Sequence, residues 1–438
     1  MATRRQLLLG GASVAGAAAL SPLLGAGDGA AAPAGRAALV QRDLPAPGAS
    51  GIDHIVVMCM ENRSFDHMLG WLPGANGRQA GLAFPDRKGV LRPTYHLGTF
   101  QGCGHPDPDH SYNGARVEYH NGACDGWLKV NDEFSIGYYR QADLPFLGHA
   151  APTWTTCDNY FAAILGPTFP NRIYLHSAQT DRLDNSLNIS SLPTIWDSLA
   201  RAGVSRRYYY NDLPFLSLWG LKYLGISHTY GTFLSDAASG NLPAVSYVEP
   251  PMFLEALDGL AKDDHPHGDI RNGEATMNGV YRAVTQSPAW PRTVLVITFD
   301  EWGGFYDHVP PTTAPDVNPA VTGLRGFRVP TLVISPFAQR GAIAHATYDH
   351  ASVLKLIEWR YGLPALTPRD AAARNLAEVL DFSAPNRSAP QWTVNSVFAL
   401  PCFLQGTQPL PGLTSTKRES AMAGLARQAR AQGWPGVG

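Results

Sequence analysis

The chain has 438 residues, of which 45% are hydrophobic and 16% charged, a balance typical of a folded globular protein and not of a disordered one. Its formal net charge of −2 and pI near 6.7 give no electrostatic basis for binding nucleic acid or an anionic membrane. The length is enough to bury the core of one large α/β domain or of two smaller domains.

The N-terminus has the features of a targeting signal. Arg4 and Arg5 precede a weakly hydrophobic, Ala/Gly-rich stretch that ends in small residues. We expect residues 1–32 to be a twin-arginine-type signal peptide, an ordinary secretory signal being the alternative, and residues 33–50 to be a flexible leader. No later stretch reaches the roughly 18 apolar residues of a membrane span, so the mature protein is expected to be secreted or extracytoplasmic.

The first predicted strand is His54–Met60, a continuous apolar run that leads directly into Glu61 and Asn62. Such a run is typical of a strand buried on both faces of a parallel sheet. Polar side chains directly after it lie at the carboxyl end of the strand, where open α/β sheets bind their ligands. An acid in this place is more often a cap or turn residue when it occurs alone.

Residues 74–150 are rich in Gly, His, Asp and aromatic residues and show little periodicity, which predicts long loops with short helices. Cysteine spacing adds little. Export permits disulfides, and Cys103–Cys124 is the first pair that we would expect; Cys59, within the first strand, is predicted to be a small buried hydrophobe. The sequence contains no C-x-x-C motif, so a thiolate metal site is not expected.

The segment GPTFPNR places Thr168 between two prolines, directly before a helical pattern that runs through Ile173–Ser177. The prolines hold the hydroxyl in a rigid turn at a helix start. Thr168 is therefore a candidate nucleophile, although a turn hydroxyl that satisfies local backbone groups is the alternative.

Helices and strands alternate through the rest of the chain, which predicts an α/β fold. The predicted helices and strands are Ser191–Ala202, Arg206–Tyr210, Ala275–Gln286, Val294–Phe299, Val329–Phe337, Asp349–Tyr361 with Gly362 as its C-cap, and a peripheral amphipathic helix at Thr416–Gln432.

The strand Val294–Phe299 repeats the pattern of the first one: it ends in Asp300 and Glu301, and two glycines then allow a sharp turn. Two buried strands that each deliver two oxygen ligands could converge on one hard cation. We expect one divalent ion, most readily Ca²⁺, Mg²⁺ or Mn²⁺, with these ligands: Glu61, Asn62, Asp300, Glu301 and, as a fifth oxygen donor, Thr168.

Two histidines lie in acidic loops, His110 in PDPDHSYNG and His265 in DDHPHGDI. Each could hold a phosphate or act as a general acid, and a surface histidine without a role is the alternative. Asp307 and His308 follow the glycine turn closely enough to interact with the metal ligands and orient them. His350 opens a helix and could cap it or contact solvent.

The sequence contains no G-x-S-x-G, P-loop, H-E-x-x-H or G-x-G-x-x-G motif. Serine hydrolases, NTPases, zincins and dinucleotide-binding enzymes are therefore without support.

Six segments between about residues 52 and 370 together resemble one family. They are HIVVMCMENRSFDHMLG, DPDHSYNG, CDNYFAAILGPTFPNRIYLHSA, DDHPHGDI, TFDEWGGFYDHVPP and YDHASVLKLIEWRYGL. Their order and content resemble the bacterial phospholipase C/acid phosphatase family of phosphoesterases, in the alkaline phosphatase-like superfamily. One departure is HPHG, where the phospholipases usually read HPP.

The resemblance implies a central β-sheet with helices on both faces and a site at the carboxyl edge of the sheet. It places the metal ligands at Glu61, Asn62, Asp300 and Glu301 and the nucleophile at Thr168. It also implies that Asn62, His110 and His265 bind the phosphoryl group, with the histidines assisting catalysis. The domains expected are a catalytic domain at 51–385 and a C-terminal extension at 386–438, either packed on the domain or trailing it.

The function expected is that of a metal-dependent phospholipase C, which cleaves a glycerophospholipid to diacylglycerol and a phosphorylated head group through a phosphothreonine intermediate. An acid phosphatase acting on phosphomonoesters and a non-catalytic phosphate- or lipid-binding protein are the alternatives. The expected partners are a phosphoester substrate and, transiently, a membrane surface, with no nucleic acid and no obligate protein partner.

Overall fold

The computed structural model describes residues 39–40, 43–252, 259–405 and 416–437, all of which belong to one compact unit, Arg36–Gly438. The expected signal peptide at 1–32 lies outside the described residues, as do residues 33–38 and 41–42 of the leader. No helix in the described ranges is both long and apolar enough to cross a membrane.

The centre of the fold is an eight-stranded sheet with the strand order β13-β6-β12-β11-β1-β10-β8-β9. Strands β11, β1, β10, β8 and β9 run parallel to one another, whereas β12 is antiparallel to both β11 and β6. Their bounds are β1 His54–Met60, β6 Thr155–Cys157, β8 Arg206–Tyr210, β9 Ser227–Thr229, β10 Val245–Val248, β11 Thr293–Phe299, β12 Leu332–Ile334 and β13 Ile343–Ala344.

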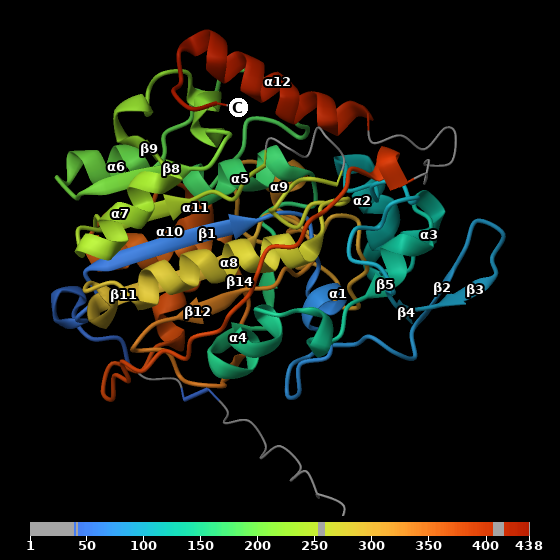
Figure 1. Cartoon of the computed structure of the whole chain (residues 1–438), viewed down its shortest axis with the longest axis horizontal. Coiled ribbons are helices and arrows are strands. Elements are labelled where there is room, and N and C mark those ends of the chain that lie inside the picture. The colour runs from blue at the N-terminus through green and yellow to red at the C-terminus, as the bar shows by residue number, and fades with distance from the viewer. Residues whose placement is uncertain (1–38, 41–42, 253–258, 406–415, 438) are drawn as a thin grey trace, which may run out of the picture. The chain divides into compact units, whose positions relative to one another are not determined.

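Helices cover both faces of the sheet, which confirms the predicted α/β class. In Figure 1, α8 lies in front of the strands and α10 lies behind them. The helices are α1 Phe65–Leu69, α2 Tyr112–Tyr119, α3 Trp127–Val130, α4 Leu147–Thr153, α5 Thr168–Ser177, α6 Ile195–Arg201, α7 Tyr230–Ser239, α8 Ile270–Thr285, α9 Pro319–Thr322, α10 His350–Tyr361, α11 Pro368–Ala372 and α12 Thr416–Gln432.

In the part of the chain that the structure describes, three two-stranded sheets lie outside the central one, and two of them belong to the loop-rich region between residues 74 and 150. The pairs are β2 Ala83–Pro85 with β3 Leu91–Pro93, β4 Tyr95–His96 with β5 Gly137–Tyr138, and β7 Tyr160–Phe161 with β14 Tyr348–Asp349.

The two strands that the sequence singled out are direct neighbours. β1 and β11 pair in parallel from His54 opposite Thr293 to Met60 opposite Phe299. From Ile55 onward both strands are buried, which explains their unbroken apolar sequence. Because Met60 lies opposite Phe299 at the ends of the two strands, the next residues, Glu61 and Asp300, lie side by side. The backbone amide of Asp300 donates to the Met60 carbonyl (3.0 Å). The predicted convergence of the two strand ends is confirmed.

Prolines and caps account for the elements that are shorter than predicted. The predicted strand Val329–Phe337 is reduced to β12, because Pro330 and Pro336 cannot donate to a ladder. The helix predicted from Ser191 begins only at Ile195, after the capping residue Thr194. The α10 prediction is confirmed, including its end at Gly362 with φ +65°.

The predicted disulfide is wrong. Cys103 is bonded to Cys402, 299 residues along the chain, and Cys124 is a buried thiol in a small aromatic cluster with Trp127. Spacing along the sequence could not show this pair, because the C-terminal segment returns to the loop of Cys103 only in the folded chain. Cys59 is buried in β1, as predicted.

Candidate active site

The site is built where β1 and β11 end. Asn62 follows Glu61 in a left-handed conformation (φ +59°), which asparagine tolerates better than most residues, and its amide donates to Asp300 Oδ1 (3.0 Å). The amide of Glu301 donates to the same oxygen (2.7 Å). All four side chains are fully buried. One carboxylate oxygen of Asp300 therefore fixes the backbone of both strand ends.

A close backbone approach at this point requires glycine. Gly303 has φ +64°, and a Cβ there would lie 2.2 Å from the carbonyl oxygen of Asn62. Its amide donates to Glu301 Oε2 (2.7 Å). The glycine turn that was predicted after Glu301 thus also orients the Glu301 carboxylate.

Thr168 is the first residue of α5 and lies beside Glu61. Its Oγ1 donates to Glu61 Oε2 over 3.3 Å, and the side chain is fully buried. Pro167, in extended conformation, caps the helix, so the hydroxyl lies at the positive end of the α5 dipole. The start of a helix favours a negatively charged oxygen or a phosphate.

Arg172, one turn further along α5, contacts the carboxylates of Glu61, Asp300 and Glu249. Its Nε donates to Glu61 Oε1 (2.6 Å) and lies 3.7 Å from Asp300 Oδ2, and its Nη1 pairs with Glu249. Burial acts to lower the pKa of Arg172, but Glu249 and Glu61 raise it well above its usual value. Glu61 therefore has one oxygen on a permanent cation and the other on the Thr168 hydroxyl.

His110 faces the same carboxylates from the loop before α2. Its Nδ1–H donates to the Pro108 carbonyl (2.7 Å). This bond directs Nε2 to the side-chain nitrogen Nδ2 of Asn62 (3.4 Å) and to Glu301 Oε1 (3.7 Å). The side chain is almost completely buried. The exchangeable position of the ring thus points toward the metal-ligand candidates.

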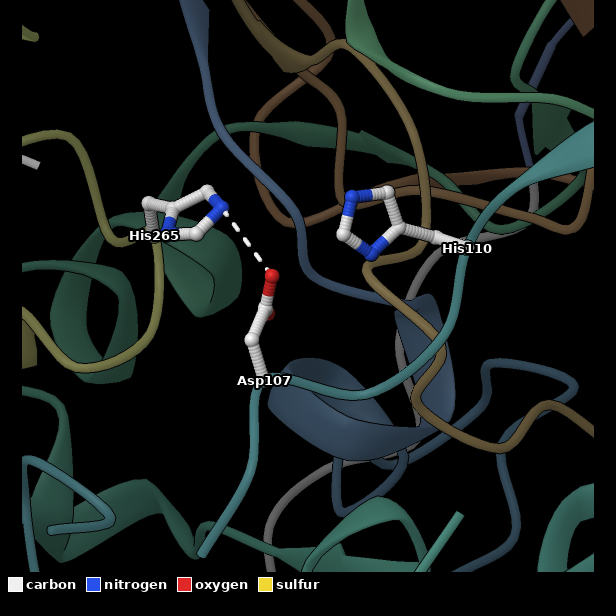
Figure 2. A group of neighbouring side chains, drawn as sticks. All are labelled: Asp107, His110 and His265. Atoms are coloured by element: carbon white, nitrogen blue, oxygen red, sulfur yellow. Dashed lines mark ion pairs between the residues drawn. The ribbon is translucent and has the colours of Figure 1, made fainter. Parts of the chain in front are cut away.

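His265 lies next to His110, and Figure 2 shows Asp107 close to both rings. The two imidazoles meet edge to face with centroids 6.3 Å apart, and His265 Nε2 is 3.7 Å from Asp107 Oδ2. The Nδ1–H of His265 donates to the Pro266 carbonyl. Both histidines therefore have Nδ1 fixed by backbone and Nε2 directed toward a carboxylate, Glu301 for His110 and Asp107 for His265.

His350 does not contact solvent, which was one expectation from the sequence. It is fully buried, its Nε2–H donates to the Asp300 carbonyl (2.7 Å), and the hydroxyl of Tyr160 donates to Nδ1 (3.2 Å). Burial lowers the pKa of His350 to about 4, so the ring is neutral at physiological pH. Its role in the fold is to position Asp300 from the start of α10.

Asp307 and His308, which we expected to support the metal ligands, belong to a neighbouring cluster. Asp307 receives hydrogen bonds from Arg328 (2.9 Å and 3.1 Å), and His308 Nδ1 pairs with Asp66 Oδ2 (2.5 Å). Burial, the largest influence, raises the pKa of Asp307 to about 6. This cluster holds the turn after Glu301 against α1, and its described contacts are not with the strand-end acids.

The donor chemistry of the strand ends fits a divalent cation. Its five candidate ligands are oxygen-bearing and fully buried, and the carboxyl groups of Glu61, Asp300, Glu301 and the adjacent Glu249 outnumber the guanidinium of Arg172, which contacts three of them. A second group, Asp107, His110 and His265, offers one ligand atom each within 4.8 Å. Its mixed nitrogen and oxygen donors are suited to a softer ion or, equally, to holding an anion.

The sequence motifs contained Arg172 without revealing its role, and they missed Glu249 altogether. Glu249 follows β10, the parallel neighbour of β1, just as Glu61 follows β1 itself. Its signal was therefore the same: an apolar run, VSYV, that ends in an acid. At four residues, the run is too short to predict a strand from the sequence.

Buried carboxylates at strand ends, a hydroxyl at a helix start and two histidines define a class of protein, the hydrolases that act on phosphate esters. Comparison with known proteins gives the narrower assignment. Residues 52–364 match the Phosphoesterase family, and the chain belongs to that family. It is a phosphoric ester hydrolase.

Several proteins are similar to this chain over most of their length. Phospholipase C B of Mycobacterium tuberculosis is 34% identical over 443 residues, which cover 82% of this chain and 83% of that protein. Non-specific phospholipase C5 of Arabidopsis thaliana is 31% identical over 407 residues, covering 79% and 77%. Among solved structures, a protein of the alkaline phosphatase superfamily from Vibrio parahaemolyticus is 10% identical, with a TM-score of 0.36 and coverage of 91% and 89%.

Proposed function

We propose that this protein is a secreted, metal-dependent phospholipase C that hydrolyses glycerophospholipids to diacylglycerol and a phosphorylated head group. The observation that carries the proposal is the position of Thr168, whose hydroxyl lies at the start of α5 and donates to Glu61 beside the strand-end acids. The names of the M. tuberculosis and A. thaliana relatives support the choice of substrate class.

In the proposed reaction Thr168 Oγ1 attacks the phosphorus atom in line with the bond to diacylglycerol. Glu61, which accepts the hydroxyl hydrogen bond, draws the proton from Oγ1. The phosphorus–oxygen bond to glycerol breaks, and Nε2 of His265 delivers a proton to the departing alkoxide. Thr168 is left esterified to the phosphorylated head group.

Water then attacks the same phosphorus atom. His265, having given up its proton, takes one from the water, the bond to Thr168 Oγ1 breaks as Glu61 returns its proton to that oxygen, and the phosphorylated head group leaves. Throughout, the Asn62 side chain, His110 and the N-terminus of α5 face the charge on the non-bridging oxygens. A divalent ion held by the strand-end oxygens would neutralise part of that charge and lower the pKa of the Thr168 hydroxyl.

Export is part of the proposal and rests on two features. Arg4 and Arg5 precede an Ala/Gly-rich stretch of the twin-arginine type. The disulfide Cys103–Cys402 supports it, because structural disulfides persist mainly in oxidising compartments.

A ³¹P NMR time course on the purified protein tests the reaction. Phosphatidylcholine, phosphatidylinositol, a glycerophosphodiester and a simple phosphomonoester are offered together, with chelator and then with Ca²⁺, Mg²⁺ or Mn²⁺ restored. We expect a phosphorylated head group to appear from a lipid, to stop with chelator and to resume with one of the ions. Inorganic phosphate from the monoester alone would instead make the protein a phosphatase, and no product from any substrate would favour a binding protein.

A further inference from the structure

The C-terminal segment does not end at the catalytic domain but runs back along α8 toward the active site. The Tyr281 hydroxyl donates to the Pro390 carbonyl (2.6 Å), Asn278 donates to the Trp392 carbonyl (3.1 Å), and the amide of Val397 donates to Asn272 (2.8 Å). The contacts move from the end of α8 to its start. Figure 1 shows this orange-red segment crossing in front of α8.

The segment then reaches the loops that carry the catalytic histidines. Cys402 is bonded to Cys103, four residues before Asp107 in the loop of His110. Gln101 of the same loop donates to the carbonyls of Leu400 (3.0 Å) and Gly259 (3.2 Å). Gly259 in turn leads to His265. The segment is therefore fixed, covalently and by hydrogen bonds, to the rim of the active site.

Large apolar side chains face solvent at this point. Phe398 is 88% exposed, Leu400 41%, Phe403 60% and Leu404 61%. Single exposed hydrophobic residues are common on any protein surface, but four within seven residues at the rim of a catalytic site mark an interaction surface. These four residues are called the apolar rim below.

Charge identifies the kind of partner. Residues 388–416 contain no Asp, Glu, Lys, Arg or His, and residues 97–104 of the disulfide-linked loop contain none either. Protein–protein interfaces usually surround their apolar centre with polar and charged groups. These two uncharged segments with their exposed Phe and Leu instead fit the boundary between lipid head groups and acyl chains, and Arg271, which lies over the Phe100 ring, is paired with Asp269.

We propose that the apolar rim inserts into the surface of a phospholipid bilayer and holds the active site against it. The inference rests on the proposed function, since a lipid that remains in its bilayer presents its phosphate only at that surface. Because neither the rim nor the protein as a whole is basic, attachment depends on apolar contact and not on anionic lipid.

The test uses two double variants of the full chain. Phe398→Ser/Phe403→Ser removes the two aromatic side chains of the rim, and Leu91→Ser/Ile189→Ser is the control, since those side chains are 64% and 54% exposed elsewhere. Each is made in a Thr168→Ala background, and binding to sucrose-loaded phosphatidylcholine vesicles is measured by sedimentation at low and high salt. Thermal unfolding checks that both variants fold.

We expect the rim variant to bind vesicles at least about tenfold more weakly, the control to bind normally, and salt to have little effect. With Thr168 restored, turnover of vesicle phosphatidylcholine should fall about as much, while turnover of a dissolved short-chain phosphatidylcholine changes less than about twofold.

Equal binding by the rim variant, or no binding by the parent, would overturn the inference. So would a change from dimer to monomer in the rim variant by sedimentation velocity, because the rim would then be a self-interface. If the protein binds vesicles but hydrolyses neither lipid, the proposed function fails and the membrane contact stands.

Discussion

At the scale of single residues, Glu61 has a divided role. One oxygen accepts from Arg172 and the other from Thr168, so the carboxylate links a buried cation to the candidate nucleophile. Arg172 also pairs with Glu249, which leaves the Glu61 carboxylate oriented from two sides. Glu61 therefore needs an arginine one helical turn beyond Thr168, because a lysine could not present several fixed donors at once.

His265 and His110 differ in their surroundings, and this predicts different losses. His110 contacts Asn62 and Glu301, whereas His265 faces Asp107. We expect His265→Ala to slow release of the leaving group in the first turnover on a phospholipid about 10²- to 10⁴-fold, because the glyceride alkoxide needs a proton to leave. On a p-nitrophenyl phosphodiester, whose leaving group is a weak base, the loss should be far smaller. Rapid-quench measurement of leaving-group release in the first turnover on both substrates measures the difference, because the later attack by water uses His265 on either substrate.

His308→Ala is the control for that experiment, because His308 pairs with Asp66 in the neighbouring cluster. It should affect both substrates alike. Equal losses on the two substrates in His265→Ala would contradict the assignment of His265 as the acid and would leave it a phosphate-binding role only.

At the scale of elements, the sequence predicted the strands that matter most because their burial leaves a clear pattern. β1, β8 and β11 are present within a residue of their predicted bounds, and the pairing of β1 with β11 follows from parallel strands lying adjacent. What the sequence could not show was contacts made across the sheet. His350 supports Asp300 from α10, and Glu249 reaches Arg172 from β10, through packing that no local pattern records.

Glu274 on α8 caps α4 and provides a pH-dependent link between these two helices. Its Oε2 accepts from the amides of Phe146 and Leu147, the latter over 2.8 Å. Burial raises the pKa of Glu274 to about 8, against 4.5 for an ordinary glutamate. Between these values the native protein holds a proton that the unfolded chain releases, so this group makes stability fall as pH rises, by at most about 1.4 kcal/mol per unit.

Glu274→Gln keeps an acceptor oxygen and removes the titration. We expect its unfolding free energy to match the wild type near pH 5 and to exceed it by a few kcal/mol near pH 8, as measured by urea unfolding across that range. Glu133→Gln, at an exposed position, is the control and should follow the wild type. An unchanged pH dependence in Glu274→Gln would show that the side chain is ionised in the native state.

At the scale of the whole molecule, Cys103–Cys402 connects the loop of His110 to a segment 299 residues later. Closing so long a loop restricts the unfolded chain, and Cys402→Ser should therefore lower the unfolding free energy by about 2–5 kcal/mol. Thermal or urea unfolding without reductant measures the loss. Reductant should destabilise the wild type and leave the variant unchanged, whereas a variant as stable as the wild type would mean that the link contributes nothing to the fold.

The central claim is that Thr168 forms a covalent bond to phosphorus, and mass spectrometry tests it most directly. Acid quenching of the protein during turnover of phosphatidylcholine, followed by proteolysis, should give a peptide containing Thr168 that is heavier by the mass of a phosphocholine ester. Thr168→Ala should give no such adduct and no turnover, while its metal content stays that of the wild type. Turnover that persists in Thr168→Ala, or an adduct on another residue, would contradict the account.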